Sequence, residues 1–203
     1  THEQVELYLR IAGLFQEKFS NVAEAIKAYE KVLELDGGNV TAIAYLKMNY
    51  EKRRDWEKLI GVHQKEIDRI ENPAERSAKF IEVAKLASEK LKKPSVSIEL
   101  WQKVLDANPQ RVEALAELEK LYEREKVWDK LVDVMETQAR LIDDRVKKVA
   151  ALQKLGILFT DKVNEPARAT AAWRALLDVE PENKRGQDAL KKLYLQQKNF
   201  DEL

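Results

Sequence analysis

The chain has 203 residues, of which 44% are hydrophobic and 35% are charged, with 36 basic and 36 acidic residues, five prolines and no cysteine. This composition is typical of a soluble globular protein that is rich in helix-forming residues. The zero net charge argues against a nucleic-acid platform, which usually carries excess positive charge, and we expect no direct nucleic-acid binding. The absence of cysteine excludes disulfides and thiolate metal sites.

No apolar run approaches the roughly 20 residues that a helix needs to span a bilayer, and no signal peptide opens the chain. We therefore expect no membrane partner and favour a cytoplasmic protein. The sequence starts on helix-like residues, THEQVELYLR, and stops at NFDEL, so we expect a fragment of a longer array.

Paired helices with short connections are predicted from the N-terminus onward. The segment DGGN, residues 36–39, closes a helix with residues that tolerate left-handed backbone angles, and Asn39 can cap the next helix. In ALAELEKLYER and VAALQKLGILF, apolar residues recur at three- and four-residue steps, which is the spacing of amphipathic helices. All five prolines fall between helical runs. The pattern predicts about eleven or twelve helices.

One helix ending occurs three times at a spacing of 72 residues, as IKAYEKVLELDGGN, IELWQKVLDANPQ and TAAWRALLDVEPEN. Each period of 72 divides into two alternating units of about 36 residues. Residues 72 positions apart form columns when the repeats are aligned, and we expect the column Lys18, Lys90 and Lys162 to be exposed. The other columns are mostly apolar: Leu33, Leu105, Leu177; Leu46, Leu118, Leu190; Tyr50, Tyr122, Tyr194; Trp56, Trp128, Phe200; Leu59, Leu131, Leu203.

A stacked helix-turn-helix unit of this length resembles the tetratricopeptide repeat (TPR), whose pattern runs W-x2-L-G-x2-Y, A-x3-F and P. The clearest match is the series Leu152, Leu155, Gly156, Phe159, Ala169, Trp173 and Pro181. The alternate units place Leu59, Leu131 and Leu203 where the family has a small alanine, so we expect their helix pairs to be spread or to cross at another angle.

The resemblance covers essentially the whole chain. It implies an all-α fold, a right-handed α-α superhelix (solenoid) of about five to six TPR-like hairpins. We expect one domain over residues 1–203, with two unit types alternating in a 72-residue double repeat.

Catalytic chemistry finds little support in the sequence. The chain contains two histidines, His2 and His63, and lacks phosphate-loop, nucleophile-elbow and zinc-protease motifs. We interpret His63 as a partly exposed helix residue and the basic segment EKRRDW, residues 51–56, as a solvated helix end. No enzyme activity, cofactor or metal is predicted.

Four tryptophans, Trp56, Trp101, Trp128 and Trp173, could suggest base stacking or a ligand cage. Their regular spacing favours packing between helices instead, because a residue placed once per repeat is usually a packing element. We expect Trp101 and Trp173 to be buried between the helices of their own and adjacent repeats.

In the family that the chain resembles, the first helix of each pair lines a concave face that binds a protein or peptide. Transferring the inward-facing positions predicts a partly hydrophobic partner-binding groove, although tighter coiling or further repeats could equally bury it. The candidate residues are Leu9, Met48, Ile81, Lys85, Lys120, Gln153, Ile157, Lys192 and Leu195.

The predicted function is a non-catalytic protein-interaction scaffold. Two alternatives remain open: a scaffold of an RNA-processing complex of the related half-a-TPR type, and a helical accessory region of a larger enzyme. The lysine and asparagine clamp that some family members use for a C-terminal carboxylate is absent from the matching positions.

The last helical pair stops early in its second helix. We therefore expect the face of Leu190, Leu193 and Tyr194 to lack its usual partner helix. This uncapped end predicts low local stability, an end-to-end contact or a homodimer.

Overall fold

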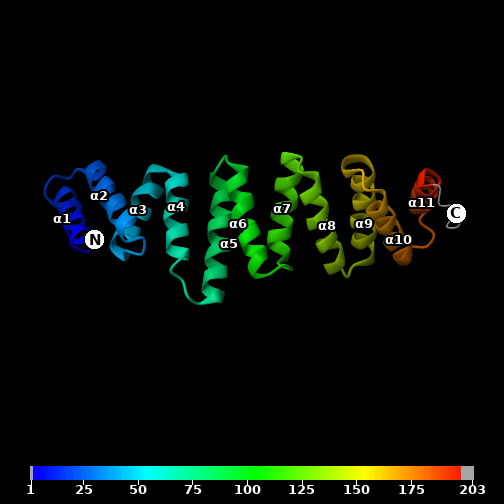
Figure 1. Ribbon diagram of the computed structural model, residues 1–203, viewed down its shortest axis with the longest axis horizontal. Coiled ribbons are helices and arrows are strands. Elements are labelled where there is room, and N and C mark those ends of the chain that lie inside the picture. Colours follow the sequence, from blue (N-terminus) through cyan, green and yellow to red (C-terminus); the bar gives the residue numbers. More distant parts are fainter. Residues whose placement is uncertain (1, 198–203) are drawn as a thin grey trace. The chain divides into compact units, whose positions relative to one another are not determined.

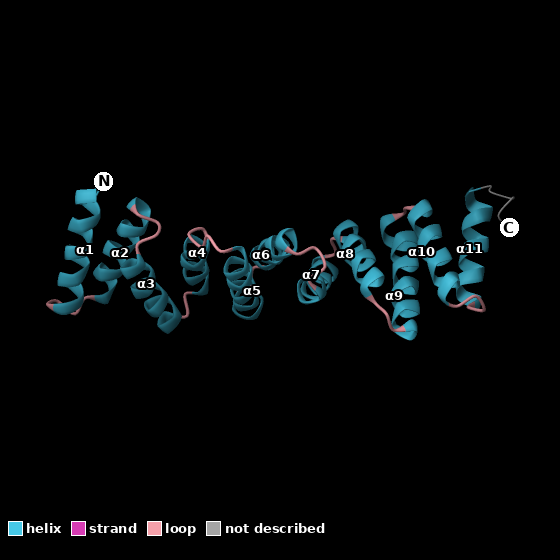
Figure 2. Ribbon diagram, turned by 90° about the horizontal axis from the view of Figure 1, so that it is seen from below, coloured by secondary structure: helices cyan, strands magenta, loops and turns pink. Residues whose placement is uncertain are grey.

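The computed structural model describes residues 2–197, and the chain divides into two compact units, Thr1–Val104 and Leu105–Leu203. Every regular element in the described residues is helical and no strand occurs there (Figure 2). The eleven α-helices of this part confirm the prediction of an all-α helical repeat. A single domain, the right-handed superhelix and the 72-residue double repeat stay predictions.

The first unit is built from helical hairpins that follow one another along the chain (Figure 1). Its apolar core runs through the first four helices and includes Ala12, Val32 and Leu46, which are at most 1% exposed. Across α2 and α3 the rings of Tyr29 and Tyr45 pack with their centroids 4.4 Å apart. The helices are α1 (His2–Glu17), α2 (Val22–Leu35), α3 (Val40–Arg53), α4 (Trp56–Ile67), α5 (Pro73–Lys90) and α6 (Pro94–Ala107), which extends past the unit boundary.

The second unit repeats this arrangement. Its core includes Leu118, Leu131, Leu155 and Leu176, none of which is more than 1% exposed. Its helices are α7 (Val112–Glu125), α8 (Trp128–Leu141), α9 (Arg145–Leu158), the short π-helical segment η1 (Phe159–Val163), α10 (Pro166–Val179) and α11 (Lys184–Gln197).

Side-chain caps and prolines fix where the helices begin. Asn39 accepts a hydrogen bond from the backbone N–H of Ala42 at 3.1 Å, as the sequence predicts. Pro73 and Pro166 occupy the first turns of α5 and α10, where a missing N–H costs nothing. Side-chain caps at the starts of other helices are supplied by Asn21, Asp55, Asn72, Asp144 and Asn183.

The prediction that residues 36–39 close α2 through left-handed angles is wrong. Neither glycine of this turn has a positive φ; instead the carboxylate of Asp36 accepts hydrogen bonds from the Gly38 N–H and the Asn39 side chain, both at 3.2 Å. Left-handed conformations occur at Arg54 and Lys126, which end α3 and α7. The turn is therefore held by hydrogen bonds to the Asp36 side chain, and it does not need the left-handed backbone angles that glycine permits.

Burial of the tryptophans follows the predicted pattern. Trp101 and Trp173 are 0% and 3% exposed, which confirms that both are buried. Trp56 and Trp128 are half-buried, and each carries a lysine ammonium over its ring, from Lys90 at 5.9 Å and from Lys162 at 5.6 Å. These two rings are therefore only partly covered and do not lie in the core. Both lysines are exposed, as expected.

The C-terminal helix differs from expectation. Leu190, Leu193 and Tyr194 are all buried, so the prediction that this face lacks a covering partner is wrong for these side chains. They are covered because α11 packs against α10, where the Tyr194 hydroxyl accepts a hydrogen bond from Arg174 at 2.7 Å. Phe200 and Leu203, which complete two of the repeat columns, lie outside the described residues.

Helices α9 and α10 of the second unit approach each other closely at Gly156. A Cβ atom built on this glycine would lie 2.6 Å from Nε1 and 2.7 Å from Cδ2 of Trp173, well inside van der Waals contact. The glycine is therefore required by the ring that packs on it, and its backbone conformation is ordinary helix.

We expect Gly156→Ala to lower the free energy of unfolding by up to about 2 kcal/mol. The overpacking cost of roughly 1–3 kcal/mol exceeds the gain of about 1 kcal/mol that alanine brings to a helix interior. Urea titration at neutral pH measures the change.

Gly61→Ala is the matched control, because nothing lies within 4 Å of a Cβ built there in the middle of α4. It should raise the free energy of unfolding by up to about 1 kcal/mol. Stabilisation by both substitutions would contradict the packing argument.

Candidate functional site

The nine candidate residues all lie on first helices of their hairpins. In the first unit they are Leu9 on α1, Met48 on α3 and Ile81 with Lys85 on α5; in the second they are Lys120 on α7, Gln153 with Ile157 on α9 and Lys192 with Leu195 on α11. None of the nine is buried, and the two most exposed apolar ones are 59% (Met48) and 50% (Leu195) accessible. They are therefore reachable from solvent.

In the first unit the candidate residues differ in how much of each side chain is exposed to solvent. Leu9 is only partly exposed, since it packs against the apolar core of α1–α4. Met48 projects from α3 with no such support. Ile81 is half-buried and Lys85 is exposed one turn further along α5. Met48 is thus more accessible to solvent than Leu9.

In the second unit α9 carries a shallow hollow that brings Gln153 and Ile157 together. The hollow is lined by Val146, Val149, Ala150, Gln153, Lys154, Ile157 and Leu158. Val146, which is 78% exposed, was not among the predicted residues. Its apolar type two residues after the Asp144 cap is a signal that sequence reasoning could have used.

An ion-pair bridge joins this surface of α9 to α7. The ammonium of Lys154 lies 3.0 Å from the Glu119 carboxylate and 3.3 Å from that of Glu123. Partial burial alone would lower the pKa of Lys154, but hydrogen bonding to Glu119 and Glu123 raises it. Lys120 on α7 pairs with Glu117 at 2.6 Å. The bridge fixes the first helices of two neighbouring hairpins beside each other.

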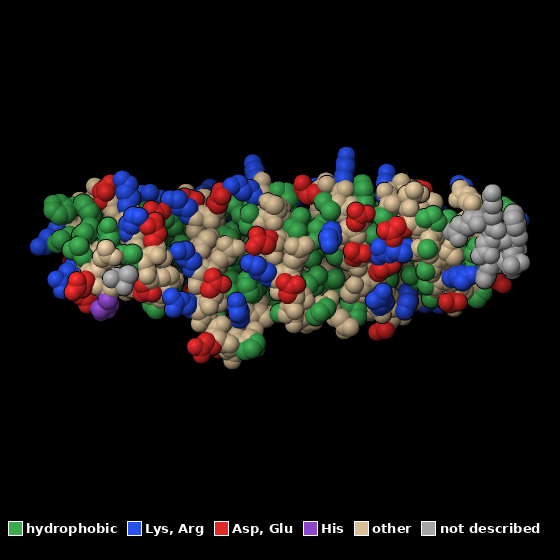
Figure 3. Space-filling model, in the orientation of Figure 1, with side chains coloured by type: hydrophobic (Ala, Val, Ile, Leu, Met, Phe, Trp, Pro, Cys, Tyr) green, Lys and Arg blue, Asp and Glu red, His purple; other side chains and the backbone are tan. Residues whose placement is uncertain are grey.

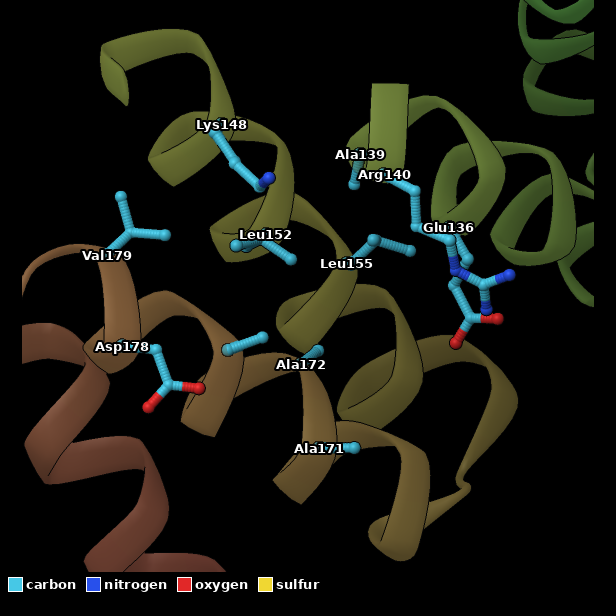
Figure 4. A pocket seen from close by; sticks show the side chains of 11 residues that line it. Glu136, Ala139, Arg140, Lys148, Leu152, Leu155, Ala171, Ala172, Asp178 and Val179 are labelled. Carbon is cyan, nitrogen blue, oxygen red and sulfur yellow. The ribbon is translucent and has the colours of Figure 1, made fainter. Parts of the chain in front are cut away.

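A second pocket, of about 410 Å³, lies in the same unit between the second helices α8 and α10. Figure 4 shows Glu136, Ala139 and Arg140 of α8 on one side and side chains of α10 on the other, with α9 between them. Leu152 and Leu155 of α9 are 7% and 1% exposed and form its floor. The α10 wall consists of Ala171, Ala172, Ala175, Asp178 and Val179. The sequence analysis did not identify this pocket.

His63 is buried, with 6% of its surface exposed, so the prediction of a partly exposed residue is wrong. It lies on the inner face of α4, where its Nδ1 is 3.1 Å from the carboxylate of Glu66. That carboxylate also receives Lys47 of α3 at 2.9 Å and Lys79 of α5 at 3.8 Å. The group is an ionic link between three helices. Burial, followed by the charge of Lys47, lowers the pKa of His63.

We expect the stability of the protein to fall as the pH drops below the ordinary histidine pKa of about 6.5. Because the pKa of His63 is lower in the folded chain, the unfolded chain binds a proton that the folded chain does not. The stability that comes from keeping His63 neutral is fully present above that pH. It is lost as the pH falls towards the pKa of His63 in the folded chain. His63→Gln should therefore reduce the loss of unfolding free energy between about pH 7.5 and pH 5.5, measured by urea titration.

His2→Gln provides the control, because the His2 side chain is 89% exposed. Its pH profile should match that of the parent. If the unfolding free energy fell equally with pH in the parent and in the His63→Gln variant, buried His63 would not be the cause of the pH dependence.

No group of three or more potential metal ligands occurs among residues 2–197. In the same part of the chain no helix is long and apolar enough to cross a membrane. Acidic and basic side chains intermingle over the face shown in Figure 3.

No family model matches the chain, and no curated protein matches it. Solved structures do resemble it. YrrB, described as a TPR protein with an unusual peptide-binding site, is 19% identical over 91% of this chain and 90% of its own, with a TM-score of 0.41. A TPR repeats protein from Bacteroides fragilis is 11% identical over 95% and 98%, with a TM-score of 0.45. MamA from Desulfovibrio magneticus is 14% identical over 89% and 97%, with a TM-score of 0.39.

Proposed function

We propose that this chain, which has a TPR-like helical repeat fold, is a non-catalytic scaffold that binds a protein or peptide partner on the surface of its first helices. Helical repeats of this kind present extended surfaces, and side chains from successive first helices share one face. We place the partner-binding surface of each unit at its candidate residues, four in the first unit and five in the second, and we add Val146 to the second.

The observation that carries the proposal is the hollow on α9. Val146 and Ile157 supply exposed or half-exposed apolar surface there, while Gln153 and Lys154 supply polar groups. Apolar contact with a few polar anchors is what a helix or extended segment of a partner requires. Val146 lies at 78% exposure, where solvent would favour a polar residue and a partner would favour an apolar one.

A photo-crosslinking amino acid placed at Gln153 tests this function in extracts of the source cells. We expect discrete crosslinked species that protease removes and ribonuclease does not. Val146→Asp should weaken them severalfold, because a charge replaces apolar contact surface.

Lys130 is the control position for the crosslinker, since its side chain is exposed and lies on the second helix α8. The same species at both positions would refute the first-helix face as the binding surface. Species that ribonuclease removes would favour the RNA-processing alternative.

A further inference from the structure

The pocket between α8 and α10 lies on the side of α9 opposite to the hollow just described. Lys148, Leu152 and Leu155 recur at helical steps of four and three and share one face of α9. Val146, Gln153 and Ile157 fall on the other face, about half a turn away. The pocket is thus a separate surface, and it does not depend on the first-helix face.

Small side chains keep this pocket open. Ala139 of α8 and Ala171, Ala172 and Ala175 of α10 line it, and these short side chains leave space over Leu152 and Leu155. An apolar cavity of roughly 150 Å³ is enough for a ring the size of benzene. A pocket of about 410 Å³ therefore has space for more than one large side chain.

Charges distinguish this pocket from its counterpart in the first unit. There, between α2 and α4, Lys58 reaches the carboxylate of Glu30 at 2.7 Å and Lys65 donates to the Leu33 carbonyl at 3.0 Å. Tyr50 adds a hydrogen bond to Glu30 at 2.5 Å. The polar groups around that groove therefore satisfy one another across it.

Around the α8–α10 pocket three of the four charged side chains have no partner among the described residues. Among the described residues neither the guanidinium of Arg140 nor the ammonium of Lys148 has an ion-pair or hydrogen-bond partner, although both line the pocket. Asp178, on the α10 wall, is likewise unpaired. Glu136 is already held by Arg168 at 2.9 Å. Two cations, one on α8 and one on α9, and one anion on α10 thus surround an apolar floor.

We propose that this pocket binds an amphipathic helix of a protein partner. Large aliphatic side chains of that helix lie over Leu152 and Leu155, between the alanines of α8 and α10. Acidic residues of that helix meet Arg140 of α8 and Lys148 of α9, and a basic residue meets Asp178 of α10. A third helix laid on two helices of small residues packs closely, and the charged contacts set its direction.

Binding to the full chain is measured with a synthetic 18-residue helical peptide that has leucines on one face, glutamates along one edge and lysines along the other. A second peptide has glutamine in place of every glutamate. We expect the first peptide to bind about tenfold more tightly, because its glutamates meet Arg140 and Lys148. Methyl NMR shifts should concentrate on Ala139, Ala172 and Leu152.

The double variant Arg140→Glu/Lys148→Glu should abolish this preference. Lys130→Glu/Lys191→Glu changes the net charge equally at exposed sites away from the pocket and should retain it. Ala175→Leu fills the pocket without changing charge and should weaken both peptides. Circular dichroism verifies that each variant is folded.

Three results would overturn the proposal: no binding of either peptide, equal loss of binding in the two charge variants, or NMR shifts at Val146 and Ile157 instead of the pocket. The first two leave the proposed first-helix function untouched. The third would support that function while removing this second site.

Discussion

The packing of one aromatic ring on one small residue sets the geometry of the hairpins. Trp173 of α10 lies so close to Gly156 of α9 that no side chain fits between them. Ala12 and Ala84 occupy the same place in the hairpins that carry Tyr29 and Trp101, and both are fully buried. The first and second helices of a pair can approach this closely only where a small residue faces the ring.

This close pairing leaves each first helix with a face that its own hairpin does not cover. Neighbouring hairpins bury part of that surface, as the bridge from Lys154 to Glu119 and Glu123 shows. The remainder stays accessible, which is why all nine candidate residues are at least partly exposed. In α9 a second pocket also lies on the opposite face, over the buried side chains of Leu152 and Leu155. A single helix thereby supports two independent surfaces.

The sequence was sufficient for features that depend on one residue type at one spacing. The burial of Trp101 and Trp173, the Asn39 cap and the placement of the candidate residues on first helices are of this kind. Each follows from local propensity or from helical periodicity.

Features that depend on what lies opposite a residue could not be predicted. His63 is buried because Glu66, Lys47 and Lys79 meet it from three helices. The α8–α10 pocket exists because alanines from two helices line the same space. In the sequence these alanines indicate only that each segment is helical. The tertiary structure also decides whether a lysine has an ion-pair partner. Lys58 pairs with Glu30, 28 residues away in the sequence, whereas Lys148 has no such partner among the described residues.

The α9–α10 hairpin is also the least well satisfied in its polar groups. Trp101 donates its Nε1–H to the Ser88 hydroxyl at 2.9 Å, but the buried Nε1–H of Trp173 has no acceptor in residues 2–197. The Thr160 hydroxyl, which stands at the same spacing of 13 residues from its tryptophan, donates instead to the Gly156 carbonyl at 2.8 Å. It does so within the π-helical segment that interrupts the regular helix after α9.

An unsatisfied buried donor costs about 1–3 kcal/mol, and a chain that is otherwise consistent in its caps and core has no structural need to carry that cost. Local departures of this kind concentrate where a protein uses its surface, and π-helical segments frequently accompany them. The hairpin that contains the departure is the one that carries the α9 hollow and most of the α8–α10 pocket. The unsatisfied donor and the two surface pockets thus belong to the same pair of helices.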